Sequence, residues 1–301
     1  MLTFHISDIL TVPFGAVMRL LYNFTGNYGI SVMLFAAVVQ IFLYPVSLKT
    51  RYNSMKLNRL EPQVQKFREQ YADDLEARDN AILDLYKKEK VSKSGGVFGA
   101  LLPIVILLIL WPIVTNPMVY LLNESSERIT IMWDALSKAA PEVFPANAAN
   151  HQMLLAGHIA EYKDVVLAVL PDASQRTLQG VNFLFLGIDL SNGPFAEFTL
   201  HPSAPDLTVL IIPVLTILFN QLTPYLSCKM LNVPYTRKKL TGKSGILKLV
   251  SFLITLWVEF LLPGALTLYI LARSILSLFI GVFLTKKIQR RLNAEMNREP
   301  V

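Results

Sequence analysis

The chain has 301 residues, of which 53% are hydrophobic and only 17% charged, and its formal net charge is +6. A water-soluble domain usually carries about 25% charged residues, so this composition excludes a chain that is soluble throughout. Its single cysteine, Cys228, excludes an internal disulfide framework. We therefore predict an all-α polytopic membrane protein, because several apolar runs approach the roughly 20 residues that a helix needs to cross a bilayer.

The N-terminal segment, residues 1–28, precedes the first long apolar run. It has neither a basic start nor a small-residue cleavage site, so we do not expect a removable signal peptide. Within it, residues 9–22 are too short to span a membrane and are interrupted by Pro13 and Arg19. This pattern is typical of an amphipathic helix that lies in the membrane interface.

Five later segments are predicted to cross the membrane: 29–48, 98–122, 207–227, 246–262 and 264–284. The intervening segments differ in charge. Segments 228–245 and 285–301 together carry ten Lys/Arg against two acids, and 49–97 carries eleven against eight, whereas 123–206 carries four against ten. The positive-inside rule then places the three basic segments in the cytoplasm. It places the N-terminus and segment 123–206 outside.

The cytoplasmic segment 49–97 is predicted to form a helical hairpin. Its apolar residues recur at helical spacing in two arms: Met55, Leu60, Val64, Phe67, Leu75, Ile82 and Leu85. Asp73 and Asp74 separate the arms and are suited to cap the second helix. The alternative is a solvated charged linker, which fits less well because both arms keep their apolar period.

The external segment 123–206 contains two further apolar stretches. Residues 151–170 have the pattern of an amphipathic helix, and residues 181–190 read VNFLFLGIDL. Neither stretch is long enough to span a bilayer. Both are therefore expected to lie at or near the outer interface.

Polar residues recur within the spans at intervals of three or four, which places them on one face of each helix. The candidate lining residues are Gln40, Tyr44, Ser47, Thr216, Asn220, Thr255, Glu259, Tyr269, Arg273 and Ser277. One interpretation is that they join helices through hydrogen bonds. The other is that they line one water-accessible cavity. Arg273 and Gln40 lie about 14 and 16 Å into their spans at 1.5 Å per residue, and a buried guanidinium is costly unless hydrated or paired, which favours the cavity.

The sequence offers no set of catalytic or metal-binding residues. It has no glycine-rich phosphate loop, no H-E-x-x-H and no G-x-S-x-G. The four histidines, His5, His151, His158 and His201, all fall outside the predicted spans. His158 and Glu161 have a spacing compatible with metal binding, but two ligands make a weak signal. We expect no enzyme activity, no metal and no cofactor.

Four segments resemble the YidC/Oxa/Alb membrane insertase family, in the order that this family has. The first reads NYGISVMLFAAVVQIFLYPVSLKTRYNSMKLNRLEPQVQKFREQY and resembles the family's first core helix with the start of its cytoplasmic hairpin. The others are YKKEKVSKSGG at the end of the hairpin, FLGIDLSNGP before the third span, and FLLPGALTLYILARSIL at the junction of the last two spans.

The resemblance implies a function, partners and a location. It implies an insertase of the short Gram-positive type in the bacterial plasma membrane. Such a protein helps nascent hydrophobic proteins enter the lipid bilayer through a hydrated, cationic groove that is open to the cytoplasm. The implied partners are nascent membrane proteins, the ribosome, the Sec translocon and the signal recognition particle receptor. The alternative is a transporter or channel that binds an anionic solute at Arg273.

Three features depart from the family pattern. Gln40 stands where the family usually has a groove arginine, and Arg273 stands where it usually has a small polar residue. We therefore hypothesise that the positive charge has moved from the first span to the fifth. The spacing between Gly95-Gly96 and the following proline also differs, and segment 123–206 is longer than the family usually has.

Overall fold

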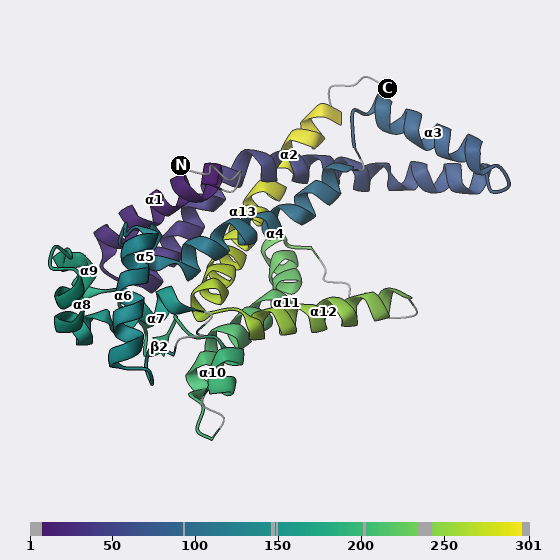
Figure 1. Ribbon diagram of the computed structural model, residues 1–301. Coiled ribbons are helices and arrows are strands. Elements are labelled where there is room, and N and C mark those ends of the chain that lie inside the picture. Colours follow the sequence, from purple (N-terminus) through teal and green to yellow (C-terminus); the bar gives the residue numbers. More distant parts are fainter. Residues whose placement is uncertain are drawn as a thin grey trace. The chain divides into compact units, whose positions relative to one another are not determined.

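The computed structural model describes residues 8–92, 94–145, 148, 150–200, 203–233 and 243–296 (Figure 1). Residues 234–242 of the predicted basic loop, residues 297–301 of the tail, and His5 and His201 lie outside the described residues. The chain forms two compact units. One comprises Met1–Val39 and Leu108–Leu278, and the other comprises Gln40–Leu107 and Phe279–Val301.

Within the residues that the structure describes, three helical segments are long and apolar enough to cross a membrane. They are α2 (Tyr28–Gln70), the segment Leu207–Leu231 formed by η2 (Leu207–Leu210) and α11 (Ile211–Leu231), and most of α13 (Gly264–Met296). Two further helices, α4 (Ser94–Thr115) and α12 (Lys243–Leu261), have shorter apolar stretches. The molecule is thus an α-helical integral membrane protein, and the five-span topology stays a prediction.

Helix α2 runs without interruption from its apolar half into its basic half. In the second unit, α3 (Leu75–Lys88) folds back beside the basic half (Figure 1). The Asp74 carboxylate caps α3 by accepting a 2.9 Å hydrogen bond from the Ala77 amide. The two helices share a buried apolar cluster formed by Leu60, Val64, Ile82 and Tyr86.

Two residues of the expected hairpin seam lie elsewhere in this unit. Leu75, the first residue of α3, is 61% exposed, because the helix turns its apolar side toward α2 only from Ile82 onward. Met55 packs instead against a second cluster, in which α13 contributes Leu284, Ile288 and Leu292. The basic half of α2 therefore packs against α3 around Leu60 and Val64, and against α13 around Met55.

A single amide side chain fastens the end of this hairpin. Asn53 Nδ2 donates to the Ser92 carbonyl at 2.6 Å, and the Ser92 amide donates to Asn53 Oδ1 at 2.8 Å. We expect Asn53→Ala to remove both bonds, each of which contributes about 0.5–1.5 kcal/mol. The two bonds together contribute about 1–3 kcal/mol, so trypsin cleavage at Lys90 should become about five- to 160-fold faster. Asn80→Ala, at an exposed position of α3, is the matched control; equal rates for the two variants would contradict this role.

The predicted span 98–122 is broken near its end. Helix α4 ends at Thr115, and a separate short helix, α5 (Pro117–Tyr120), follows. Asn116 between them has φ −121° and ψ 60°, because proline disfavours the helical conformation in the residue before it. The Asn116 side chain compensates by donating to the Pro112 carbonyl at 2.8 Å.

The helices between Ser126 and Gln179, in the predicted external segment, pack into a helical domain. Its helices are α6 (Ser126–Ala139), α7 (His151–His158), η1 (Ile159–Tyr162), α8 (Lys163–Val169) and α9 (Gln175–Gln179). The single helix expected over residues 151–170 is thus divided at η1, which lets both halves pack against α6. The fully buried side chains include Met132, Leu136, Phe144, Leu155 and Ile159.

A buried carboxylate connects the two ends of this domain. Glu124, whose side chain is 8% exposed, accepts a 2.8 Å hydrogen bond from Arg128 Nε and a second one from the Thr177 hydroxyl. Arg128 also pairs with Asp172 at 2.8 Å. The hydrogen bonds that Arg128 donates to Glu124, and then to Asp172, raise the pKa of Arg128, so the cation is stabilised in the folded domain.

Residues 181–194 follow this domain in the chain and form hydrogen bonds with the start of the distant helix α13. They form the antiparallel strands β1 (Leu184–Phe185) and β2 (Ile188–Asp189), followed by α10 (Pro194–Leu200). The Leu190 and Asn192 carbonyls accept hydrogen bonds from the Ala265 and Gly264 amides at 2.9 and 2.8 Å. These amides lie in the first turn of α13, where no helical carbonyl is available to them. Two of the segments that carry the family resemblance are therefore joined directly.

Candidate substrate groove

The predicted groove residues of α12 and α13 include two buried polar groups. Glu259, in the last turn of α12, and Tyr269, in the second turn of α13, are each 2% exposed. Among the described residues, neither Glu259 Oε2 nor the Tyr269 hydroxyl has a hydrogen-bond partner. Buried polar atoms without a partner are rare because their desolvation is costly. A polar environment supplied by water or by a bound polypeptide would offset that cost.

Arg273 lies one helical turn beyond Tyr269 and is partly buried. The two side chains are close enough to interact electrostatically. Ser277, a further turn along α13, is exposed. The stripe that sequence spacing predicts on α13 therefore runs from a buried phenol through a partly buried guanidinium to an exposed hydroxyl.

The predicted threonines behave differently. The Thr216 hydroxyl is fully buried and donates to the Ile212 carbonyl at 2.8 Å, and the Thr255 hydroxyl donates to the Ser251 carbonyl at 2.9 Å. Both bonds stay within the residue's own helix, as is common for threonine in membrane helices. Asn220 on α11 is partly buried. The two threonines thus satisfy their own hydrogen bonds and need no polar cavity.

The α2 stripe belongs to the second unit. Gln40 is 7% exposed, and Tyr44 and Ser47 are partly buried. Tyr44 packs against the cluster of Leu284, Ile288 and Leu292. The structure therefore assigns these three residues to the second unit and the seven others to the first. Convergence of all ten candidates on one groove stays a prediction.

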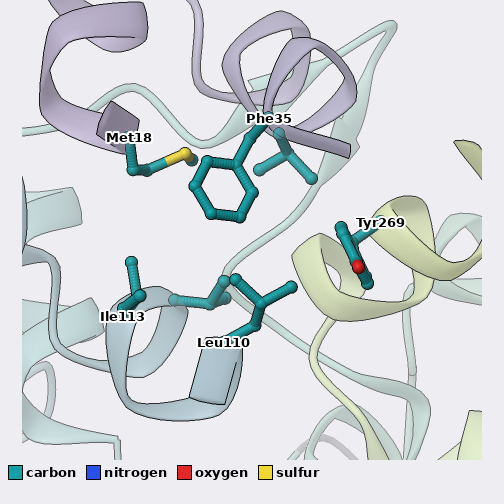
Figure 2. Close-up of a pocket in the computed structure, with 7 residues that line it drawn as sticks. Met18, Phe35, Leu110, Ile113 and Tyr269 are labelled. Carbon is teal, nitrogen blue, oxygen red and sulfur yellow. The ribbon is translucent and has the colours of Figure 1, made fainter. Parts of the chain in front are cut away.

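The Tyr269 ring lines a small apolar pocket in the first unit (Figure 2). Its lining residues come from α1 (Asp8–Thr25), α2, α4 and α13: Met18, Val32, Phe35, Leu110, Ile113, Val114 and Tyr269. Sequence spacing assigned Tyr269 to a polar stripe and did not identify Met18. Met18 lies seven residues after Thr11 and three residues after Gly15 on α1. Helical spacing therefore places Met18 on the same face as these two residues, and the structure buries that face.

Metal binding has no support in the part of the chain that the structure describes, where no group of three or more His, Cys, Asp or Glu side chains could hold an ion. The predicted His158–Glu161 pair has 3.6 Å between Nδ1 and Oε1. The His158 ring packs edge-on against Phe144. This pair belongs to the packing of the external domain.

Comparison with known proteins identifies related chains. The family model described as "60Kd inner membrane protein" matches residues 20–291. Among curated relatives, a membrane protein insertase YidC from Lawsonia intracellularis is 33% identical over 114 residues, which cover 38% of this chain and 21% of the relative. A YidC from Geobacter sulfurreducens is 34% identical over 97 residues (32% and 18%). A YidC from Methylorubrum extorquens is 24% identical over 197 residues (65% and 28%). The matched parts thus span less than a third of each relative's length.

Proposed function

Because the chain belongs to the 60Kd inner membrane protein family, which is the YidC/Oxa/Alb family, we propose that it helps nascent hydrophobic proteins enter the lipid bilayer. The family match over residues 20–291 is the observation that carries this proposal. A protein with this task makes and breaks no covalent bonds. Its functional site is the surface along which the polar part of a substrate crosses the membrane.

We propose that this surface is a hydrated groove lined by the ten predicted residues. The partly buried Arg273 and the exposed Ser277 on α13 support it, since both polar side chains remain accessible to water. Arg273 supplies a positive charge on the same helix as Tyr269. A hydrated groove shortens the dry part of the path that a hydrophilic segment must cross, which lowers the cost of its transfer.

The cytoplasmic elements are suited to the first contact with a substrate. The hairpin of α2 and α3 has an apolar seam and a charged surface, and the C-terminal half of α13 is basic. A basic surface attracts the ribosome, which is rich in RNA phosphate. We propose that the ribosome, the Sec translocon and the signal recognition particle receptor meet the protein on its cytoplasmic side.

Site-specific crosslinking tests the groove. A photo-crosslinking amino acid at Ser47 lies on the proposed groove face of α2, whereas one at Phe42 points away, since Phe42 is 200° around the helix from Gln40 at 100° per residue. Phe42 is 67% exposed, as expected for a residue that faces lipid. We expect ribosome-bound membrane-protein chains to be captured from Ser47 and not from Phe42.

Two other outcomes would overturn parts of this proposal. Equal capture from both positions would reject the groove as the substrate path. Capture from neither position would reject the insertase function and favour the alternative, a transporter or channel for an anionic solute. The crosslinks are scored with a newly synthesised single-span protein arrested at several lengths, so that transient contacts are sampled.

A further inference from the structure

The tip of the β1–β2 hairpin combines two unfavourable features at one residue. Leu186 and Gly187 are the two residues between the strands, and both have positive φ, +53° and +82°. A two-residue hairpin loop with this geometry favours asparagine, aspartate or glycine at its first position. A leucine there is strained, because its Cβ approaches the backbone in the left-handed region.

The same leucine is almost completely exposed. Leu186 is 87% and Leu184 is 56% exposed. In water, no favourable interaction would offset the energetic cost of the strained backbone or of the exposed apolar side chain. A strained residue that also presents an apolar side chain points to a contact outside the chain.

The first strand is held at the start of α2. The Phe183 ring packs edge-on against Tyr28, with 4.9 Å between ring centroids. The Phe185 ring lies so close to Gly29 that a Cβ on this glycine would approach it to 2.4 Å. Tyr28 and Gly29 are the first two residues of a helix that is long and apolar enough to cross the membrane. The hairpin thus lies where α2 enters the bilayer.

The second strand is held at the start of α13. The carbonyls of Leu190 and Asn192 accept from the first amides of this helix, and α13 is also long and apolar enough to cross the membrane. Two independent attachments therefore place the hairpin at the level of the membrane interface. This placement depends only on α2 and α13 crossing the bilayer and not on which side the hairpin faces.

The end of α1 presents further apolar side chains beside this attachment. Phe24 is 84% and Leu20 is 67% exposed. The same end of α1 contacts the hairpin segment, since the Asn182 amide donates to the Tyr22 hydroxyl at 3.4 Å. On α2, the partly exposed Ile30 continues the apolar surface into the span.

We propose that the β1–β2 tip is a membrane anchor that inserts Leu186 and Leu184 into the lipid interface beside Leu20 and Phe24. The occupant of this surface is the bilayer itself, because the surface is continuous with the lipid-facing side of α2. Lipid removes the exposed leucines from water and so compensates the strained turn. The anchor fixes the orientation of the external domain on the membrane.

A fluorescent label at the tip tests this anchor. In a full-length Cys228→Ser background, Leu186→Cys is labelled with an environment-sensitive nitrobenzoxadiazole dye and reconstituted into phosphatidylcholine–phosphatidylglycerol vesicles. Glu142→Cys, at an exposed turn of the external domain, is the matched control. We expect blue-shifted emission and strong quenching by nitroxide lipids at position 186 only. The vesicles contain no other protein that could change the environment of the dye. Water-like emission at position 186 would therefore overturn the proposal.

A second variant separates anchoring from folding. Leu186→Asn places a favoured residue in the turn, so the thermal stability in detergent should stay equal or rise. A dye at Leu184→Cys should nevertheless shift to water-like emission when Leu186 is replaced by asparagine, and should stay blue-shifted with Leu186→Met. Unchanged emission in the asparagine variant would reject an anchoring role. The assay uses no insertion substrate, so its failure is distinct from failure of the proposed function.

Discussion

Replacing Gly193 by alanine is expected to lower the free energy of unfolding of the protein, because an added Cβ has no room at this position. A Cβ at this position would lie 2.3 Å from the Leu262 carbonyl oxygen and 2.9 Å from its carbon. Both are backbone atoms, so no side-chain rotation relieves the clash. The segment must move, and the hydrogen bonds that the Gly264 and Ala265 amides donate to the Asn192 and Leu190 carbonyls weaken with it. We expect a loss of about 2–4 kcal/mol from overpacking and lost hydrogen bonds.

Thermal unfolding of the purified protein in detergent measures this loss, and we expect a fall in Tm of roughly 5–10 °C. Gly157→Ala is the matched control. At that position, inside α7, the nearest atom to an added Cβ is Phe183 Cδ2 at 3.5 Å, an ordinary contact. Alanine should stabilise this helix by about 0.5–1 kcal/mol. A Gly193→Ala protein that unfolds at the wild-type temperature would contradict the docking of residues 190–194 on α13.

Replacing Arg273 by alanine is expected to impair the insertion of substrates with acidic translocated tails. If the groove charge lies on α13 and not at Gln40, an acidic tail loses its main electrostatic attraction when Arg273 is removed. Loss of a partly desolvated ion pair that contributes about 1–2 kcal/mol should lower the insertion rate about five- to thirty-fold. Arg273→Lys keeps the charge and should retain most of the activity.

Insertion is measured in proteoliposomes with two model proteins that differ only in the charge of the translocated tail. The variant Arg290→Ala serves as the control, because it removes an exposed positive charge from the same helix outside the predicted span. It should affect acidic and neutral tails equally. Normal insertion of the acidic tail by Arg273→Ala would reject the transferred groove charge.

Sequence reasoning performed well where the signal is local. The apolar length of α2 and α13 exceeds what a soluble helix needs, so hydropathy alone identifies them as candidate spans. The helical hairpin of α2 and α3 is also predictable, because the apolar residues of each arm, Val64 and Ile82 among them, recur at helical spacing and Asp74 is a favourable N-cap. The family resemblance rested on segments that the family model also covers.

Sequence reasoning performed less well where distant segments meet. The run 181–190 predicts an apolar stretch at the interface, but it does not predict that the stretch forms a hairpin whose two ends dock on different helices. The spacing of apolar residues predicts which residues share one face of a helix or strand, but it does not predict which segment packs against that face. The break of α4 at Asn116 was readable from Pro117, whereas the division of residues 151–170 at η1 was not.

The sequence by itself determined that this is a helical membrane protein of the insertase family, because length, hydropathy, charge bias and family motifs are local properties of the chain. It also predicts polar residues on one face of four of the five predicted spans. Only the tertiary structure decided which of them keep an unsatisfied polar atom. Thr216 and Thr255 bond within their own helices, whereas Glu259 and Tyr269 are buried without a described partner. The physical reason is that burial and hydrogen-bond satisfaction depend on which helices pack together, and spacing along one helix carries no information about its neighbours.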